Sequence, residues 1–156
     1  FENQELKFGI FKKSDNLRIG RFNLFELEGH GFVSSGVDNK YTGYMDNTYY
    51  IGEFVEGRLT GYGHYATKDD LQKYYGEFVN FSKNGFGSEY NLVNEPFEFH
   101  GIFKDNAFHG YGILYTVSSN GELTTTTGFY QNDTYVHDDK DIVYDNWSDE
   151  YSIRWN

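Results

Sequence analysis

The strongest constraint on the fold is a spacing of glycines that recurs along the chain. A first glycine is followed nine and eleven residues later by two more, with an aromatic residue two before the first glycine and a Phe two after it. The three clearest copies contain Gly52, Gly61 and Gly63; Gly76, Gly85 and Gly87; and Gly101, Gly110 and Gly112. A unit that recurs at a step of about 25 residues indicates a stacked repeat architecture.

Within each copy the residues alternate as they do in a β-strand. Tyr50, Gly52 and Phe54 alternate with Ile51 and Glu53, which is the period-two pattern of a half-buried strand. The segment around the second and third glycines alternates in the same way, and a turn separates the two. The sequence therefore predicts β-hairpins at 50–65, 74–90 and 99–115, and no helix longer than two turns before residue 136.

One face of each predicted hairpin carries only glycines and aromatic rings. A glycine leaves a gap above a sheet, and an aromatic ring from the neighbouring strand can cover it. We therefore expect Gly63, Gly87 and Gly112 to lie under rings of an adjacent strand. Because an isolated hairpin is marginally stable in water, stability must come from stacking the units.

The aromatic-x-Gly-x-Phe…Gly-x-Gly unit resembles the MORN repeat, and the resemblance covers roughly residues 7–139. It implies an all-β fold, an elongated single-layer antiparallel meander of stacked β-hairpin repeats. We assign residues 1–139 to an array of about six units, of which the first and last are degenerate. We assign residues 140–156 to an acidic cap or tail. Its segments 142–144 and 151–155 alternate as short strands and are expected to close the last sheet edge; the alternative is that Trp147 and Trp155 anchor a partner.

Two copies depart from the pattern at the turn. Phe81 stands where a turn glycine is usual, and Asp105-Asn106 replaces Glu-Gly. Since glycine adopts positive φ at little cost, its loss predicts turns that are longer or differently shaped.

The sequence lacks several motifs that mark catalytic and metal sites. There is no cysteine, no Gly-x-Ser-x-Gly and no His-Glu-x-x-His. The histidines lie beside repeat glycines, as variable positions of the unit: His30, His64, His100, His109 and His137. We therefore expect a protein that is not an enzyme and that holds no metal and no cofactor.

The charge distribution limits the partners. A net charge of −11 disfavours nucleic acid, whose phosphates would be repelled. The N-terminal region is the exception, with a basic cluster that offers a patch for anionic lipid or an acidic partner: Lys12, Lys13, Arg18 and Arg21. Such a small patch gives weak, salt-sensitive membrane contact at best, so we expect no appreciable binding to phosphoinositide vesicles at physiological salt.

Two faces of the sheet compete as the binding surface. The sequence favours the aromatic–glycine face, whose strip a partner or a second copy would cover: Tyr50, Phe54, Tyr65, Tyr74, Phe78, Phe99, Phe103 and Tyr115. The opposite face is mixed, with Ile51, Glu53, Tyr62, Glu77, Phe86, Ile102 and Tyr111. An alternative interpretation is that sheet curvature closes the aromatic strip into a self-sufficient core.

The resemblance implies interaction and no common chemistry. We expect a protein-binding scaffold in the cytoplasm, a structural subunit of a larger cytoskeletal, ciliary or membrane-associated assembly. One alternative is a module that associates with anionic membranes. Another is an accessory repeat segment of a larger enzyme, whose catalytic domain would lie outside these residues.

Overall fold

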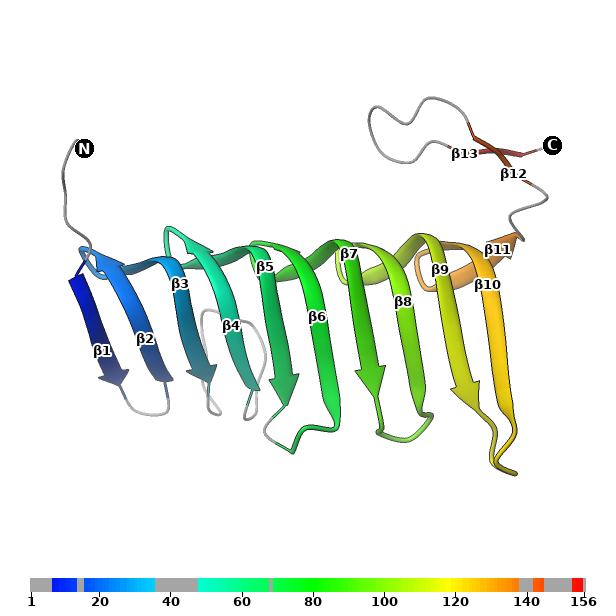
Figure 1. The fold of residues 1–156 in the computed structure, drawn as a ribbon, viewed down its shortest axis with the longest axis horizontal. Coiled ribbons are helices and arrows are strands. Elements are labelled where there is room, and N and C mark those ends of the chain that lie inside the picture. The colour runs from blue at the N-terminus through cyan, green and yellow to red at the C-terminus, as the bar shows by residue number, and fades with distance from the viewer. Residues whose placement is uncertain are drawn as a thin grey trace.

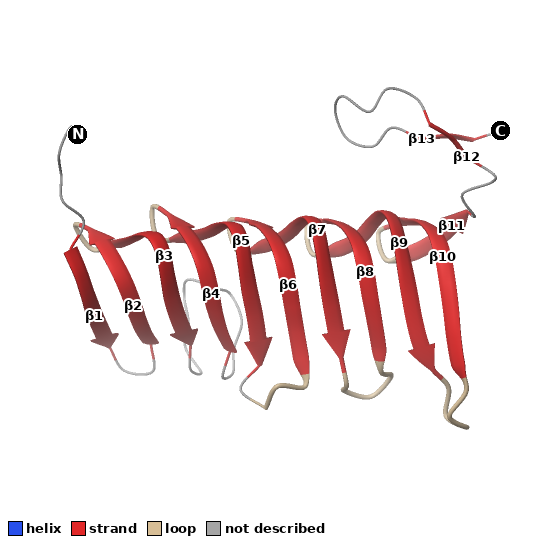
Figure 2. Ribbon diagram, in the orientation of Figure 1, coloured by secondary structure: helices blue, strands red, loops and turns tan. Residues whose placement is uncertain are grey.

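The computed structural model describes residues 7–13, 16–35, 48–67, 69–137, 142–144 and 153–155. In this part of the chain every regular element is a strand (Figure 2). Eleven of them form one antiparallel sheet in chain order: β1 (Lys7–Lys13), β2 (Asn16–Asn23), β3 (Glu26–Ser35), β4 (Thr48–Val55), β5 (Arg58–Thr67), β6 (Gln72–Val79), β7 (Ser82–Asn91), β8 (Phe97–Lys104), β9 (Ala107–Val117), β10 (Leu123–Gln131) and β11 (Thr134–His137). This confirms the all-β meander and the three predicted hairpins (Figure 1).

The two remaining strands lie outside this sheet. β12 (Ile142–Tyr144) and β13 (Ile153–Trp155) pair with each other as a separate two-stranded sheet. They do not extend the long sheet by pairing with β11. The predicted boundary between residues 139 and 140, and Trp147, lie outside the described residues.

A row of glycines sets the register of the long sheet. Each strand from β1 to β10 contributes one glycine, and each lies directly opposite the next: Gly9, Gly20, Gly31, Gly52, Gly63, Gly76, Gly87, Gly101, Gly112 and Gly128. Residues directly opposite each other point to the same face of a sheet. The glycine row therefore fixes which residues face inward along the whole array.

Each hairpin that is closed by a tight turn contains a bulge on the turn side of the glycine row. Between the pairs Gly52↔Gly63 and Phe54↔Leu59, one residue of β4 faces Thr60–Tyr62 of β5. The same irregularity follows Gly76 and Gly101. Bulges bend strands, and Figure 1 shows the strands bending over near their tight-turn ends.

The carboxylate of the Gly-Glu-Phe motif supports this bulge. Glu53 Oε2 accepts a hydrogen bond of 2.9 Å from the backbone N–H of Tyr62, in the bulged segment of β5. Glu77 accepts one of 2.6 Å from Phe86 in the next hairpin. These N–H groups lie in the bulged segments, and the glutamate of the Gly-Glu-Phe sequence supplies each with an acceptor.

Four of the tight turns share one geometry, which corrects one prediction; the first, Leu24-Phe25, has positive φ at Leu24 alone. Glu56-Gly57, Asn80-Phe81, Asp105-Asn106 and Asn132-Asp133 are two-residue turns with positive φ at both positions. The expectation of longer or different turns at Phe81 and Asp105-Asn106 was wrong. Asn and Asp tolerate the left-handed region, and Phe81, with φ of 64°, is held there by burial of its ring.

At Phe81 the cost of a strained backbone can be compared with the stabilisation from burying the ring. Its ring is 9% exposed and packs edge-on against Tyr50, with centroids 5.3 Å apart. Left-handed φ costs about 1–2 kcal/mol, whereas truncating a buried Phe costs about 3–5 kcal/mol. We therefore expect Phe81→Gly to destabilise the protein by about 2 kcal/mol.

The matched substitution is Glu56→Gly, at an exposed turn residue with φ of 50°. It removes strain without removing a buried ring, so it should leave stability unchanged or raise it by up to about 1 kcal/mol. Urea unfolding of both variants measures the difference. If Phe81→Gly stabilises the protein, burial of the Phe81 ring contributes less free energy than the left-handed backbone conformation costs.

The core lies on the inner side of the bend. It contains Leu27, Val33, Tyr50, Phe54, Leu59, Tyr74, Phe78, Phe81, Phe99, Phe103, Phe108 and Tyr130. Rings also cover glycines as predicted: a Cβ on Gly87 would meet the Tyr74 ring and one on Gly112 the Phe99 ring. A Cβ on Gly63 would lie 3.2 Å from the Phe78 ring and 3.0 Å from Leu59.

Candidate interaction surface

The predicted aromatic strip is a core and not an open surface. Six of its eight residues are at most 2% exposed: Tyr50, Phe54, Tyr74, Phe78, Phe99 and Phe103. Tyr65 is half-buried and lies 5.1 Å from Tyr50 between ring centroids. The expectation that this strip stays open to solvent was wrong, because the bulges bend each hairpin over its own inner face. Curvature, the alternative interpretation, closes the strip.

Tyr115 was assigned to the wrong face. In the third hairpin Leu114 lies opposite Phe99, in the position that Tyr65 has opposite Tyr50. Tyr115 lies opposite Glu98, one residue further along β9, and therefore points to the other side of the sheet. We call this side the outer face.

A continuous series of rings crosses the outer face from β3 to β9. We call it the ring ladder: Phe32, Tyr49, His64, Tyr75, Tyr90, His100 and Tyr115. Neighbouring centroids are 4.1–6.2 Å apart. His64 stacks on Tyr75 at 4.1 Å, and burial lowers the pKa of His64, which favours the neutral ring.

A second set of aromatic residues on the outer face is more exposed. Tyr62, Phe86 and Tyr111 occupy the same position in β5, β7 and β9, directly before the glycine row, and are 67%, 58% and 37% exposed. We call them the exposed row. Alternate strands lie about 9.4–9.8 Å apart, so the exposed row presents one ring per hairpin at a regular step.

The charges around the exposed row are mainly negative. Tyr62 lies opposite Glu77, and Glu53 accepts the Tyr62 N–H. Glu77 also accepts the backbone N–H of Phe86. Two carboxylates therefore lie beside Tyr62 and Phe86, which makes this part of the outer face acidic and aromatic. Further along the strands, Glu98 lies opposite Tyr90 and Tyr115, and Lys73 lies opposite Tyr90.

The outer face also carries an arrangement that resembles a hydrolytic triad. Ser88 Oγ lies 2.6 Å from His100 Nδ1, and His100 Nε2 lies 2.7 Å from Glu98 Oε1. With the proton on Nε2, the imidazole accepts from Ser88 and donates to Glu98, which is the order that activates a serine. The sequence alone does not reveal this arrangement, since it depends on the pairing of β7 with β8.

The surroundings of Ser88 do not support catalysis. β7 is paired on both sides, with Ser88 opposite Tyr75 and His100, so its backbone groups lie within the sheet ladder. They are not free to stabilise an oxyanion, and losing one such donor already costs about 10²–10³ in kcat. We interpret the three side chains as a polar contact of the outer face.

A serine-directed fluorophosphonate probe tests this interpretation. We expect no labelling of Ser88 beyond that of the other serines, because the adduct has no oxyanion donors to stabilise its formation. Peptide mass spectrometry measures the labelled site, and the His100→Asn variant is the control. Selective labelling of Ser88 that disappears in this variant would show that the serine is activated.

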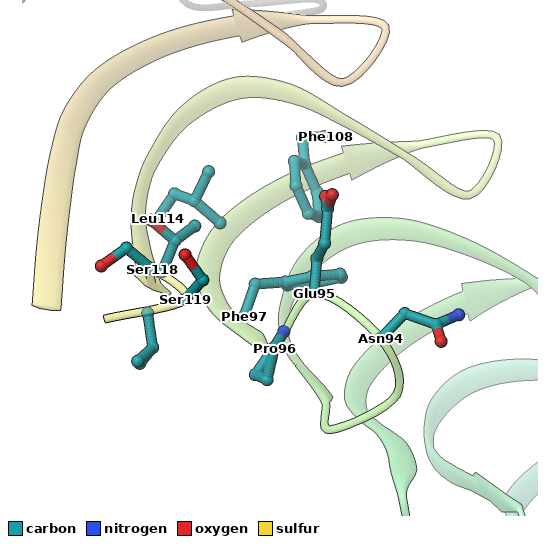
Figure 3. Close-up of a pocket in the computed structure, with 10 residues that line it drawn as sticks. Asn94, Glu95, Pro96, Phe97, Phe108, Leu114, Ser118 and Ser119 are labelled. Carbon is teal, nitrogen blue, oxygen red and sulfur yellow. The ribbon is translucent and has the colours of Figure 1, made fainter. Parts of the chain in front are cut away.

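A groove lies on the inner side of the third hairpin. It has a volume of about 700 Å³ and lies between the loops 92–96 and 118–122, with Phe97, Phe108 and Leu114 inside the bend of the strands (Figure 3). Phe97 and Phe108 contact edge-on at 5.7 Å and belong to the packing of the core. The groove therefore continues the core toward the loop edge of the sheet.

The predicted basic patch is divided between the faces. Phe11 and Arg18 lie opposite each other on the inner side, and Arg18 Cζ is 5.2 Å from the Phe11 ring centroid. Lys12 and Arg21, both exposed, lie on the outer side. The Lys13 side chain lies outside the described residues. The fold thus does not bring Arg18 together with Lys12 and Arg21.

Within the residues described, no group of three or more potential ligands is placed to hold a metal ion. Successive ladder histidines, His64 and His100, are separated by Tyr75 and Tyr90, while the His137 side chain is not described. Among the described segments, no helix could cross a membrane.

Comparison with known families supports the repeat assignment. The model of the MORN repeat matches residues 50–70 and 99–120. These matches begin at Tyr50 and Phe99, the aromatic residues that stand two before the first glycine in two of the clearest repeats. No curated protein matches the chain.

Proposed function

Since the chain is a MORN-repeat protein, we propose that it is a non-catalytic protein-interaction module whose outer face holds a partner. MORN repeats are commonly involved in protein or membrane interactions. The observation that carries the proposal is the exposed row on the outer face. The inner aromatic side chains are already buried by the chain itself, so the outer face is the surface that a partner can cover.

The partner that best fits is a basic amphipathic helix lying across the strands. Seven residues of an α-helix rise about 10.5 Å, close to the step of about 9.4–9.8 Å between alternate strands. Apolar residues at heptad spacing would therefore meet Tyr62, Phe86 and Tyr111 in turn. Lysines and arginines beside them would face Glu53 and Glu77, and such complementarity favours encounter and orientation.

A synthetic helix with leucines at heptad spacing and lysines on its polar face is a direct probe. We expect it to bind the chain in fluorescence anisotropy, and its glutamate counterpart not to bind. The combined variant Tyr62→Ser, Phe86→Ser and Tyr111→Ser keeps every charge but removes the exposed row. It should weaken binding by at least about tenfold, because central aromatic residues dominate interface energies.

A control variant removes exposed apolar residues elsewhere. Leu71→Ser and Leu92→Ser change two side chains at the loop edge, which are 39% and 62% exposed. This variant should bind the probe as the unmodified chain does. Equal affinity of the exposed-row variant and the unmodified chain would contradict the proposal.

Membrane association is the second candidate, and the divided basic patch disfavours it. Clusters of basic residues bind anionic membranes when they act together near one surface. We expect the chain not to sediment with phosphoinositide vesicles at physiological salt. Salt-resistant co-sedimentation that is abolished by Lys12→Glu and Lys13→Glu would favour the membrane over a protein partner.

The wider setting of the module rests on the family alone. We propose that its partner belongs to a larger cytoskeletal, ciliary or membrane-associated assembly in the cytoplasm. The alternative is that the array is an accessory segment of a larger enzyme. Co-localisation of the full-length gene product with microtubule or membrane markers, and the sequence of that product, separate these settings.

A further inference from the structure

We propose that copies of this chain associate head to tail, with β1 of one copy pairing along the open half of β10 in the next. This association concerns the two ends of the sheet and goes beyond the partner surface on the outer face. It follows from two incomplete edges that complement each other in length, direction, register and charge.

The C-terminal edge of the sheet is only half covered. β11 pairs with Phe129, Tyr130 and Gln131 at the turn side of β10. The rest of β10, Leu123–Gly128, pairs with β9 on one side, and no described strand pairs with it on the other. This open half is rich in β-branched residues, Thr124–Thr127, which favour strand pairing.

The N-terminal edge is a regular strand with exposed apolar side chains. β1 pairs with β2 along its whole length without a bulge, and in the described chain it has no partner on its other side. Phe8 and Ile10 are 69% and 68% exposed. An edge strand of this kind, without proline or bulge, is a template for another strand.

The two edges are complementary in register. Both strands can be compared with β5, the second strand of the hairpin β4–β5. When the tight turns are superimposed, Tyr135 in β11 corresponds to Leu59 in β5. When the glycine rows are superimposed, Gly9 in β1 corresponds to Gly63 in β5. β11 therefore fills the turn half of a strand position and β1 the loop half. The two strands would overlap at one position only, because His137 of β11 and Lys7 of β1 both correspond to Gly61 of β5.

A second copy can therefore complete the edge. Continuing the glycine row places Gly9 of the incoming copy opposite Gly128, Phe11 opposite Thr126 and Lys12 opposite Thr125. The strand direction is also correct. β11 is the second strand of its hairpin and β1 corresponds to the second strand of a hairpin, so each runs antiparallel to β10. Up to five residues of β1, Gly9–Lys13, would gain strand partners.

The first tight turn indicates the same neighbour. In the later hairpins the second turn residue donates its N–H to a carbonyl of the preceding hairpin, as in Gly57 to Leu27 and Asp133 to Phe108, both at 3.0 Å. Leu24 and Phe25 form the first turn, in which only Leu24 has positive φ, and they are 83% and 81% exposed. A neighbouring copy at this end of the sheet would take the place of the preceding hairpin and cover both side chains.

Charge favours this arrangement over pairing of two β1 strands. Residues 1–25 carry five basic and three acidic residues, 5 − 3 = +2, and the remainder carries 8 − 21 = −13. β1 contains Lys7, Lys12 and Lys13, so two β1 edges would bring like charges together. A contact between unlike ends does not close on itself and gives an open series of oligomers.

Disulfide trapping tests the register, because the chain contains no cysteine. We expect a mixture of the Lys12→Cys and Thr125→Cys variants to form a cross-linked dimer, since opposite residues in an antiparallel pair lie within disulfide reach. Lys12→Cys mixed with Arg58→Cys, an exposed position in the middle of the array, should not. Equal cross-linking of both mixtures would contradict the register.

Sedimentation velocity tests the association itself. The average mass of the unmodified chain should rise continuously with concentration, and Lys12→Glu should reduce this rise while Arg58→Glu does not. The proposal is overturned if the chain stays monomeric at every concentration and gives no specific cross-link. In that case β10 is covered by a strand of another protein or by the chain's own residues after His137, or is left open. Binding of the leucine–lysine helix to the outer face is measured separately and can succeed in either case.

Discussion

Replacing Phe99 by alanine is expected to lower the free energy of unfolding by about 3–5 kcal/mol. Phe99 is fully buried and stacks on Phe108, with ring centroids 3.9 Å apart. It also contacts Phe103 and Tyr130 edge-on at 5.3 and 5.2 Å. Truncation therefore leaves a cavity between neighbouring hairpins and uncovers Gly112, whose missing side chain the Phe99 ring replaces.

The control for Phe99 is Tyr115, a residue that the sequence placed on the same face and the structure places on the other. Tyr115 is half-buried, and its ring centroid lies 6.2 Å from that of His100. Tyr115→Ala should cost less than about 1.5 kcal/mol, since little packing is lost on the outer face. Urea unfolding followed by circular dichroism measures both, and equal losses would contradict the one-sided core.

Replacing Gly101 by alanine is expected to destabilise the protein by about 3 kcal/mol, the upper end of the cost of overpacking. An added Cβ would meet the backbone of β9, at the Tyr111 carbonyl oxygen and 2.6 Å from Gly112 Cα. A flexible side chain could move aside, but backbone held in the sheet ladder cannot do so without breaking the glycine row.

Gly121→Ala is the matched substitution for Gly101. Gly121 lies in the loop before β10 with φ of 87°, and an added Cβ would meet no heavy atom within 4 Å. Its cost should be limited to backbone strain, about 1–2 kcal/mol. Differential scanning calorimetry of the two variants compares them. A smaller melting-temperature loss for Gly101→Ala than for Gly121→Ala would show that the strands can separate at the glycine row.

The sequence predicts the hairpins because one simple constraint controls them. Only glycine fits where two strands approach closely or where a ring lies over the sheet, so the spacing of Gly63, Gly87 and Gly112 reports the register directly. The face of Tyr115 was misjudged because it was counted three residues from Gly112, whereas Tyr65 lies two from Gly63. In a strand, a difference of one residue reverses the side of the sheet.

The bend of the hairpins could not be predicted from the alternation alone. It arises because Thr60–Tyr62 face a single residue of β4, and a pattern of period two does not reveal how many residues oppose each other. Without the bend, the aromatic strip remains open; with it, the strip becomes a core. The pair Ser88 and His100 was missed for a related reason, since they meet only once Gly87 is known to lie opposite Gly101.

Hydroxyl-radical footprinting of the unmodified chain, alone and with the leucine–lysine helix, tests the central claim most directly. The account predicts rapid oxidation of Tyr62, Phe86 and Tyr111 in the free chain, slow oxidation of Tyr50 and Tyr74, and protection by the helix confined to the first three. Rapid oxidation of Tyr50 and Tyr74 in the free chain, suppressed when the helix binds, would instead make the aromatic–glycine face the binding surface and contradict the account.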